Sequence, residues 1–166
     1  MQKRELEKQF EQQVKEHELL IHKVCRIYAF TQVNRQDLFQ EIIIQLWKAY
    51  PKFKGDAKFS TWLYRVAINT AISGLRKEKN FIQSYEPENL PLHLSDTSNS
   101  NILEEQMQQL YTAIEKLNEI EKAIVMLYLE DRSYEEMEEI LGISQGTLRV
   151  KMNRIKDKLR QLTKNN

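Results

Sequence analysis

The chain has 166 residues, a formal net charge of +1 and a mean hydropathy of −0.62, and 30% of its residues are charged. No apolar run approaches the roughly 20 residues of a membrane-spanning helix, so we expect no membrane insertion. A charged start without a signal-peptide core and a single cysteine, Cys25, predict a protein of the reducing cytoplasm. The scarcity of glycine and proline favours an all-α fold.

Three or four helices are predicted in the first 82 residues. The first is expected from Leu6 to Phe30, and the second runs from a cap at Asn34 to Pro51. Ser60 or Thr61 can cap the third. The side chains expected to face inward are Leu19, Leu20, Val24 and Ile27, then Phe39, Ile43, Leu46 and Tyr50, and finally Leu63, Val66, Ala67 and Ala71.

Helical periodicity fades over residues 83–101, which contain Pro87, Pro91 and a run of Ser, Asp, Thr and Asn. This composition is typical of a flexible linker. The sequence therefore predicts two small helical domains, residues 1–82 and 102–166, joined by this linker. Each of them is long enough to form a helical core.

The second domain begins with helices expected over Ile102–Leu117 and about Glu119–Glu130. Ser133 and Glu136 then form the pattern of a capping box, in which each side chain satisfies a free backbone N–H of a new helix. That helix is predicted over Tyr134–Leu141.

A sharp turn and a basic helix follow. Gly142 can adopt the left-handed conformation that ends a helix, and Ser144 can cap a last helix from Gln145 to about Leu162. Residues 113–141 hold nine acidic and three basic side chains, whereas residues 142–166 hold seven basic and one acidic. Helix, short turn and basic helix form a helix-turn-helix, and the local basic charge favours DNA binding.

The last helix divides into an apolar stripe and basic faces. Leu148, Met152, Ile155, Leu159 and Leu162 fall at helical steps and are predicted to pack inward. Arg149 matches the two acceptors of guanine, and Gln145 and Asn153 match adenine. The side chains suited to phosphate contacts are Thr147, Lys151, Lys156 and Lys158. A plainer interpretation is that Lys and Arg simply favour solvated faces and helix ends.

The helix before the turn is acidic, which is unexpected beside DNA. Its carboxylates belong to Glu135, Glu136, Glu138 and Glu139. We expect these groups to face away from DNA, or to contact polymerase or neighbouring Lys and Arg residues.

Three segments resemble extracytoplasmic-function (ECF) sigma factors, the minimal branch of the sigma-70 family. DLFQEIIIQLW at residues 37–47 and FKGDAKFSTWLYRVAIN at residues 53–69 resemble their region 2. Residues 113–159, with SYEE at 133–136 and LGIS at 141–144, resemble their region 4. The resemblance implies a non-enzymatic factor that binds core RNA polymerase and promoter DNA, needs no cofactor, and is held by an anti-sigma factor.

The resemblance also implies roles for individual residues. Those matching polymerase-binding positions are Asp37, Gln40, Glu41 and Trp47. Those in the part that reads and opens the −10 element are Lys58, Trp62, Arg65, Asn69, Arg76 and Lys77, and aromatic faces such as Phe59 and Tyr64 can stack on unpaired bases. In region 4, the positions that match those facing the −35 element are Arg149, Val150, Asn153 and Arg154. The helix-turn-helix pattern adds Gln145, Thr147, Lys151 and Lys158 to this set. The alternative for Trp47 and Trp62 is a role in the core, and the alternative for Phe59 is a hydrophobic staple.

Other chemistry is weakly supported. His22 and Cys25 share one face of the first predicted helix, but no second pair completes a metal site, so no metal is expected. No glycine-rich phosphate loop or activated nucleophile is evident. Two rival functions remain: a dimeric helix-turn-helix regulator that acts without polymerase, and a helical adaptor that would leave the basic last helix unexplained.

Overall fold

The computed structural model describes the backbone of residues 2–82 and 102–164 and the side chains of residues 2–75 and 104–164. Every regular element within these ranges is helical, which confirms the predicted all-α fold. The described elements, in chain order, are α1 (Gln2–Glu16), α2 (Glu18–Tyr28), α3 (Gln32–Ala49), the 3-10 helix η1 (Tyr50–Lys52), α4 (Phe59–Ile82), α5 (Ile102–Glu115), α6 (Glu119–Leu129), α7 (Tyr134–Leu141) and α8 (Gln145–Lys164). The expected linker, residues 83–101, lies outside the described residues.

The prediction of one continuous first helix is wrong, because the chain breaks at His17 into α1 and α2. His17 has φ −115° and ψ 14°, and its Nδ1 lies 2.9 Å from the carbonyl oxygen of Gln13. The break lets α1 lie against the end of α3, where the ring of Phe10 contacts those of Trp47 and Tyr50 at 5.0 and 5.2 Å. Sequence periodicity alone does not reveal a break of this kind.

The N-terminal core forms where α2, α3 and α4 pack together. Its buried side chains are Ile21, Val24, Cys25, Ile27 and Tyr28 from α2, Ile42 and Leu46 from α3, and Leu63, Tyr64, Ala67, Ile68, Ala71 and Ile72 from α4. The predicted stripe of α3 is displaced: Ile42 is buried, whereas Phe39 and Ile43 are only partly buried. Leu19, which was expected to face inward, is 65% exposed in the first turn of α2.

Two helices begin earlier than their predicted caps. The N-cap of α3 is Thr31, whose Oγ1 accepts a hydrogen bond from the backbone N–H of Asn34 at 3.1 Å. Helix α4 begins at Phe59, so Ser60 and Thr61 both lie inside it, and Thr61 is buried. Threonine at an N-cap satisfies a backbone donor as asparagine would, so the prediction for α3 was wrong only in the position of the cap.

The C-terminal helices follow the predicted pattern closely. Ser133 caps α7 by accepting from the backbone N–H of Glu136 at 3.1 Å, and Gly142 ends α7 with φ 71°, as expected. Only this half of the predicted capping box forms, because the Glu136 carboxylate pairs with Arg132 instead. The full reciprocal capping box occurs one helix earlier, where Asn118 and Glu121 cap the start of α6 with bonds of 2.8 and 3.0 Å. These caps satisfy backbone groups that would otherwise be unpaired at closely spaced helix ends.

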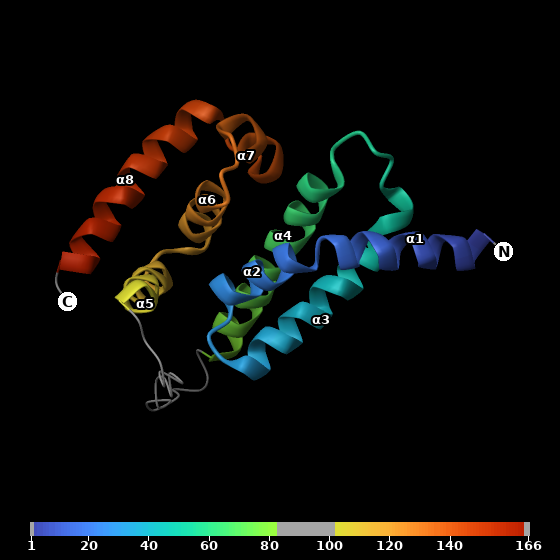
Figure 1. Cartoon of the computed structure of the whole chain (residues 1–166), viewed down its shortest axis with the longest axis horizontal. Coiled ribbons are helices and arrows are strands. Elements are labelled where there is room, and N and C mark those ends of the chain that lie inside the picture. The colour runs from blue at the N-terminus through green and yellow to red at the C-terminus, as the bar shows by residue number, and fades with distance from the viewer. Residues whose placement is uncertain (1, 83–101, 165–166) are drawn as a thin grey trace.

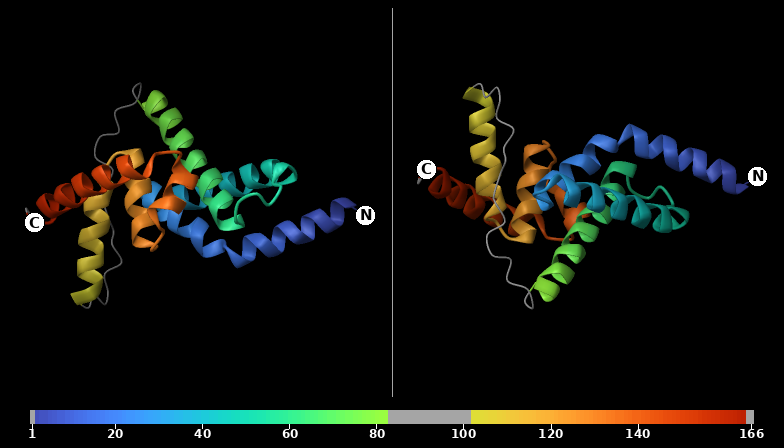
Figure 2. Two further views of the ribbon diagram at one scale, coloured as in Figure 1. Left: turned by 90° about the horizontal axis from the view of Figure 1, so that it is seen from above. Right: turned by 90° about the horizontal axis from the view of Figure 1, so that it is seen from below.

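The two halves of the chain pack directly against each other. In Figure 1, α2 and α4 lie between α1 and α3 on one side and α5–α8 on the other. Helix α2 contacts α5 and α6, and α4 contacts α7, and the views from above and below in Figure 2 agree with this arrangement. We call α1–α4 the N-terminal group, α5–α8 the C-terminal group, and these contacts the group interface.

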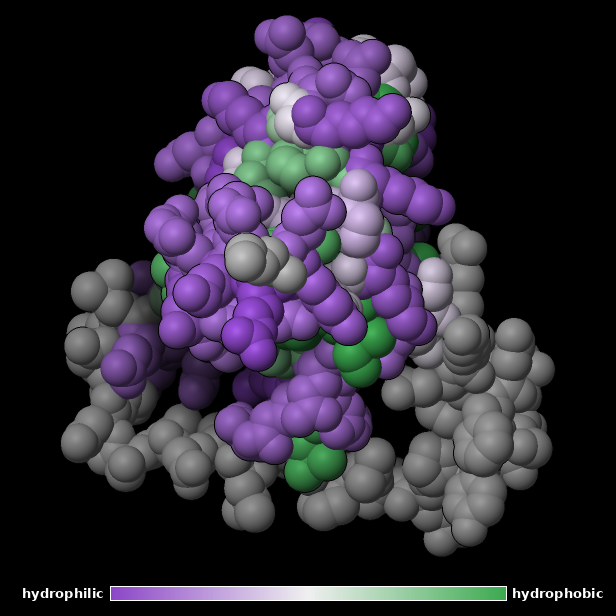
Figure 3. Space-filling model, turned by 90° about the vertical axis from the view of Figure 1, so that its right-hand side faces the viewer, coloured by the Kyte–Doolittle hydropathy of each residue, from purple (hydrophilic) through white to green (hydrophobic). Residues whose placement is uncertain are grey.

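The surface is largely hydrophilic on the face from which α1 projects, and hydrophobic side chains there form separate patches (Figure 3). The more exposed large apolar residues include Leu19, Val33, Ile44 and Val150. Among the described helices, none is both long and apolar enough to cross a membrane.

Candidate polymerase and promoter interfaces

The exposed face of α3 presents the polar residues expected to bind polymerase. Asp37, Gln40 and Glu41 are all exposed, and Glu41 accepts a hydrogen bond from the side-chain amide of Gln45 at 2.9 Å. Trp47 differs, because its ring is partly buried against Phe10 at 5.0 Å. This face therefore offers carboxylates and amides to a partner, with Trp47 at its edge.

An aromatic cluster forms where α3 ends and α4 begins. Its members are Tyr50, Phe53, Phe59 and Trp62, with ring centroids between 4.9 and 6.5 Å apart. All four rings are partly buried, so they pack on one another while keeping exposed area. The rings of Trp62 and Phe59 are therefore neither fully buried nor fully exposed.

Tyr64 cannot stack on a base in this structure, contrary to expectation, because it is fully buried. The guanidinium of Arg132, from the turn after α6, lies 5.2 Å from its ring centroid. Burial raises the pKa of Tyr64 to about 12, and the nearby positive charge of Arg132 opposes that rise. The ring is therefore covered by the C-terminal group.

The basic and polar residues expected at the −10 element lie along α4. Lys58, Arg65 and Asn69 are exposed. The guanidinium of Arg65 donates to the backbone carbonyl of Glu139 in α7, from Nε at 2.8 Å and also from Nη2. The side chains of Arg76 and Lys77 lie outside the described residues.

The helix-turn-helix is formed by α7 and α8. Leu148, Met152 and Ile155 are buried and fix α8 against the rest of the C-terminal group. Ser144 Oγ accepts from the backbone N–H of Thr147 at 3.3 Å, which confirms the expected cap. The position of α8 is therefore set by an apolar seam on one side and a capped turn at its start.

Most residues expected at the −35 element are exposed on α8. The exposed residues are Thr147, Arg149, Val150, Asn153, Arg154 and Lys158, whereas Gln145 and Lys151 are partly buried. The guanidinium of Arg149 lies 5.1 Å from the ring centroid of Tyr134, and this stacking holds it at the start of α8. Lys158 pairs with Glu121 at 3.0 Å, so its charge is partly neutralised within the protein.

The acidic helix α7 is partly neutralised by its neighbours. Glu136 pairs with Arg132 at 3.2 Å, whereas Glu135, Glu138 and Glu139 are exposed. The expectation that these carboxylates contact nearby basic residues is confirmed for Glu136.

His22 and Cys25 have different surroundings in the structure. His22 pairs with Glu18 at 3.3 Å and stacks on Phe39 at 4.7 Å. The thiol of Cys25 is buried, and burial raises its pKa to about 11 against the opposing charge of Arg35. No group of three metal-binding side chains occurs in the described part of the chain.

The group interface contains residues that sequence reasoning missed. Lys23 pairs with Glu130 at 2.7 Å, and Lys122 is 7% exposed with its ammonium 4.9 Å from the ring centroid of Phe30. Tyr28 Oη donates to a backbone carbonyl 91 residues away in the sequence. No local pattern predicts such pairs, because their partners are brought together only by tertiary packing.

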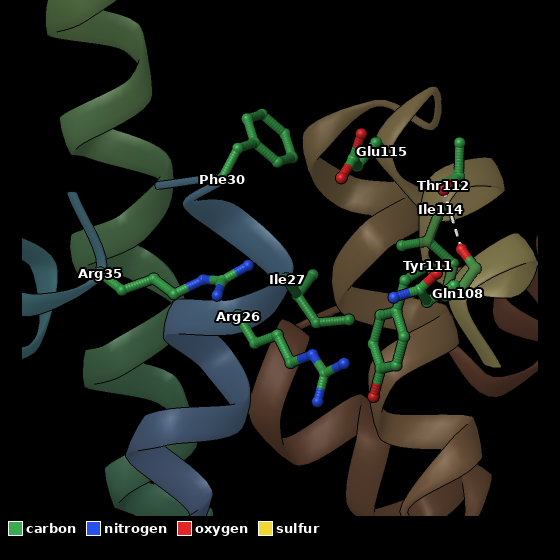
Figure 4. Close-up of a pocket in the computed structure, with 9 residues that line it drawn as sticks. All are labelled: Arg26, Ile27, Phe30, Arg35, Gln108, Tyr111, Thr112, Ile114 and Glu115. Carbon is green, nitrogen blue, oxygen red and sulfur yellow. Dashed lines mark hydrogen bonds between the residues drawn. The ribbon is translucent and has the colours of Figure 1, made fainter. Parts of the chain in front are cut away.

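A groove of about 310 Å³ crosses the same interface. Figure 4 shows Arg26 and Arg35 from the N-terminal group facing Tyr111, Gln108 and neighbouring residues of α5. Arg26 lies 4.2 Å from the ring centroid of Tyr111. The two groups thus meet through charged and aromatic side chains as well as through apolar ones.

Both groups of helices are similar to known protein families. Residues 13–81 match the family model of sigma-70 region 2, and residues 107–159 match that of sigma-70 region 4. The ECF RNA polymerase sigma-E factor of Escherichia coli K12 is 33% identical over 132 residues, covering 73% of this chain and 69% of the relative. The sigma-E factor of Haemophilus influenzae is 32% identical over the same length, covering 73% and 70%.

Solved structures share the fold. The sigma factor RpoE of Bartonella quintana, in complex with the anti-sigma factor NepR, has a TM-score of 0.75 at 20% identity and covers 95% of this chain and 98% of that one. CnrH, in complex with the cytosolic domain of CnrY, has a TM-score of 0.69 at 18% identity, with 96% and 90% covered. Because both region matches occur in family order and the sigma-E relatives share a third of the aligned residues, this chain belongs to the sigma-70 family, in its ECF branch.

Proposed function

We propose that the chain is an ECF-type RNA polymerase sigma factor that binds core polymerase, recognises −10 and −35 promoter elements and promotes transcription initiation. The observation that carries this proposal is the occurrence, in one chain, of a region 2 match followed by a region 4 match that ends on an exposed basic helix. The factor has no catalytic activity of its own and acts in the cytoplasm, where polymerase works.

We assign three surfaces to three partners. The polar face of α3, with Asp37, Gln40 and Glu41, docks on core polymerase, and Trp47 contributes at its edge. The exposed side of α4 and the aromatic cluster at its start bind the −10 element, because cations follow phosphates and aromatic faces stack on unpaired bases. The exposed side of α8 reads the −35 element in the major groove.

The residues assigned to the −10 element are Lys58, Trp62, Arg65, Asn69, Arg76 and Lys77. Those assigned to the −35 element are Gln145, Thr147, Arg149, Val150, Lys151, Asn153, Arg154 and Lys158. We assign binding of the −10 element to a domain of residues 1–82 and binding of the −35 element to a domain of residues 102–166. Residues 83–101 join the two domains. The family matches, at 13–81 and 107–159, fall inside these bounds.

An anti-sigma factor is the third proposed partner. Two solved structures with this fold are complexes, one of the sigma factor RpoE with the anti-sigma factor NepR and one of CnrH with the cytosolic domain of CnrY. A protein that binds both groups of helices would keep them from polymerase and DNA.

Run-off transcription with purified core polymerase on a genomic fragment library tests the proposal. New start sites should appear only when the chain is added, and Arg149→Ala should weaken promoter binding by about 1–3 kcal/mol and relax specificity at one −35 base pair. Arg160→Ala is the matched control, because Arg160 is 71% exposed on the same helix but near its far end. Start sites that do not depend on the chain, or specific binding of a dimer to a palindrome without polymerase, would instead indicate one of the rival functions.

A further inference from the structure

The tyrosine that begins α7 lies against the arginine expected to read a base. Tyr134 is the first residue of α7, directly after the Ser133 cap, and its partly buried ring packs on the hydrophobic core. The guanidinium carbon of Arg149, near the start of α8, lies over this ring at 5.1 Å from its centroid. Because α7 packs beside the start of α8 (Figure 1), the ring is a fixed support for a side chain that is otherwise exposed.

This contact leaves the hydrogen-bonding edge of Arg149 unused. A guanidinium that stacks on an aromatic ring offers its flat face, whereas its N–H donors lie in the plane of the group. Among the side chains that the structure describes, the Arg149 guanidinium has neither an ion-pair nor a hydrogen-bond partner, although α7 supplies four glutamates. All of its donors therefore remain available for the two acceptors of a guanine.

Other cations of the C-terminal group are held by carboxylates instead. Arg132 pairs with Glu136 at 3.2 Å, and Lys158 pairs with Glu121 at 3.0 Å. A carboxylate binds the same two parallel N–H groups of a guanidinium that a guanine would bind, so it would compete with the base. An aromatic ring holds the cation without this competition.

A second tyrosine contacts a lysine of α8 in a similar way. The ammonium of Lys156 lies 4.7 Å from the ring centroid of Tyr128, in α6. Lys156 follows Arg149 by seven residues, which is about two helical turns, so both cations lie on the same side of α8. An ammonium is a compact charge suited to phosphate, which carries no sequence information, whereas the guanidinium fork matches guanine. The two tyrosines therefore form a matched pair with different expected consequences for DNA binding.

We propose that Tyr134 is a positioning residue for base recognition, which holds Arg149 by the face of its guanidinium so that the free edge meets a guanine of the −35 element. This inference rests on the proposed function, because it takes Arg149 as a promoter contact. A long side chain loses rotamer freedom when it binds, and a side chain that is already held loses less. Removing the ring should therefore reduce discrimination between bases, whereas contacts with phosphates depend on charge.

Nuclear magnetic relaxation of arginine Nε–H groups tests the support in the full chain without DNA. The order parameter of the Arg149 Nε–H should be high in the wild-type chain and in Tyr134→Phe, which keeps the aromatic face. It should fall in Tyr134→Leu and in Tyr134→Met, which keep apolar bulk without that face. The matched control, Tyr128→Leu, should leave it unchanged. Urea unfolding followed by circular dichroism verifies that each variant is folded.

Competition binding with reconstituted polymerase holoenzyme tests the consequence for DNA. The probes are a promoter fragment recovered by run-off transcription and a set of fragments in which each −35 base pair is replaced in turn. Tyr134→Leu should lower discrimination at the base pair that Arg149 reads by about two- to fivefold, the range of an exposed cation–π contact, and Tyr134→Phe should preserve it. In an Arg149→Ala background, Tyr134→Leu should change discrimination no further. Tyr128→Leu should not alter discrimination at any −35 base pair.

The role of Tyr134 is overturned by an unchanged order parameter in Tyr134→Leu and Tyr134→Met, or by a loss of discrimination that persists without Arg149 or appears equally in Tyr128→Leu. These results are distinct from a failure of the proposed function. If the wild-type chain directed no run-off transcription, the function itself would be contradicted. Normal transcription with unchanged discrimination in Tyr134→Leu would contradict only the role of Tyr134.

Discussion

Replacing Gly142 by alanine tests whether the turn of the helix-turn-helix is governed by backbone conformation. Gly142 has φ 71°, and its N–H bonds to the carbonyl of Glu138 at 2.8 Å to close the end of α7. A Cβ added at this position would meet no atom within 4 Å. The cost of Gly142→Ala is therefore the left-handed backbone alone, about 1–2 kcal/mol.

Gly146 offers a matched control four residues away. It lies in the first turn of α8, its φ is not in the left-handed region, and an added Cβ there also meets no atom within 4 Å. Gly146→Ala should stabilise the chain by about 0.4–1 kcal/mol, because alanine restricts the unfolded state without strain in the folded one. The same chemical change is thus expected to have opposite signs at the two positions.

Urea and thermal unfolding followed by far-ultraviolet circular dichroism measure both effects. For a chain of this length, Gly142→Ala should lower the melting temperature by about 2–8 °C, and Gly146→Ala should raise it by about 1–4 °C. If the two variants changed the free energy of unfolding in the same direction, positive φ would not be the reason for glycine at 142.

Three further predictions concern the polymerase surface, a helix cap and the buried thiol. Glu41→Lys should weaken association with core polymerase in a pull-down titration while leaving the circular dichroism spectrum unchanged. The control, Glu11→Lys on α1, should not weaken this association. If the two variants bound polymerase with equal affinity, the assignment of α3 to polymerase would be removed. Asn118→Ala should lower the free energy of unfolding by about 0.5–2 kcal/mol through loss of the capping box, whereas Thr163→Ala near the end of α8 should change it little. The pKa of the Cys25 thiol rises from 9.0 to about 11 on folding, so the contribution of this thiol to stability is present below pH 9 and is lost as the pH rises towards 11. Cys25→Ala should therefore flatten the dependence of the free energy of unfolding on pH between pH 9 and 11. If the variant and the wild-type chain showed the same slope in this range, the raised pKa would be contradicted.

The C-terminal group could be predicted from sequence almost to the residue, because its signals are local. Ser133, Gly142 and Ser144 occupy the cap and turn positions that their chemistry favours, and the Leu148, Met152 and Ile155 stripe is buried as its spacing indicates. Each of these features depends on residues within one or two helical turns.

The N-terminal group was predicted less well where tertiary contacts compete with local preference. The break at His17 allows Phe10 to contact the end of α3. Ile42, rather than Phe39 or Ile43, is buried in the core because α2 and α4 both pack on the side of α3 that carries Ile42. Periodicity identifies an apolar face, but the same pattern is compatible with several rotations of the helix, each of which buries a different apolar residue.

Composition, spacing and local capping were enough to predict the all-helical fold, the helix-turn-helix with its basic last helix, and the resemblance to region 2 and region 4 of the ECF sigma factors. It took the folded chain to show that α7 packs on α4, that Arg65 bonds to Glu139, and that Lys23 pairs with Glu130, 107 residues away. Contacts between distant segments arise from the shapes and charges of assembled surfaces, which no local stretch of sequence encodes.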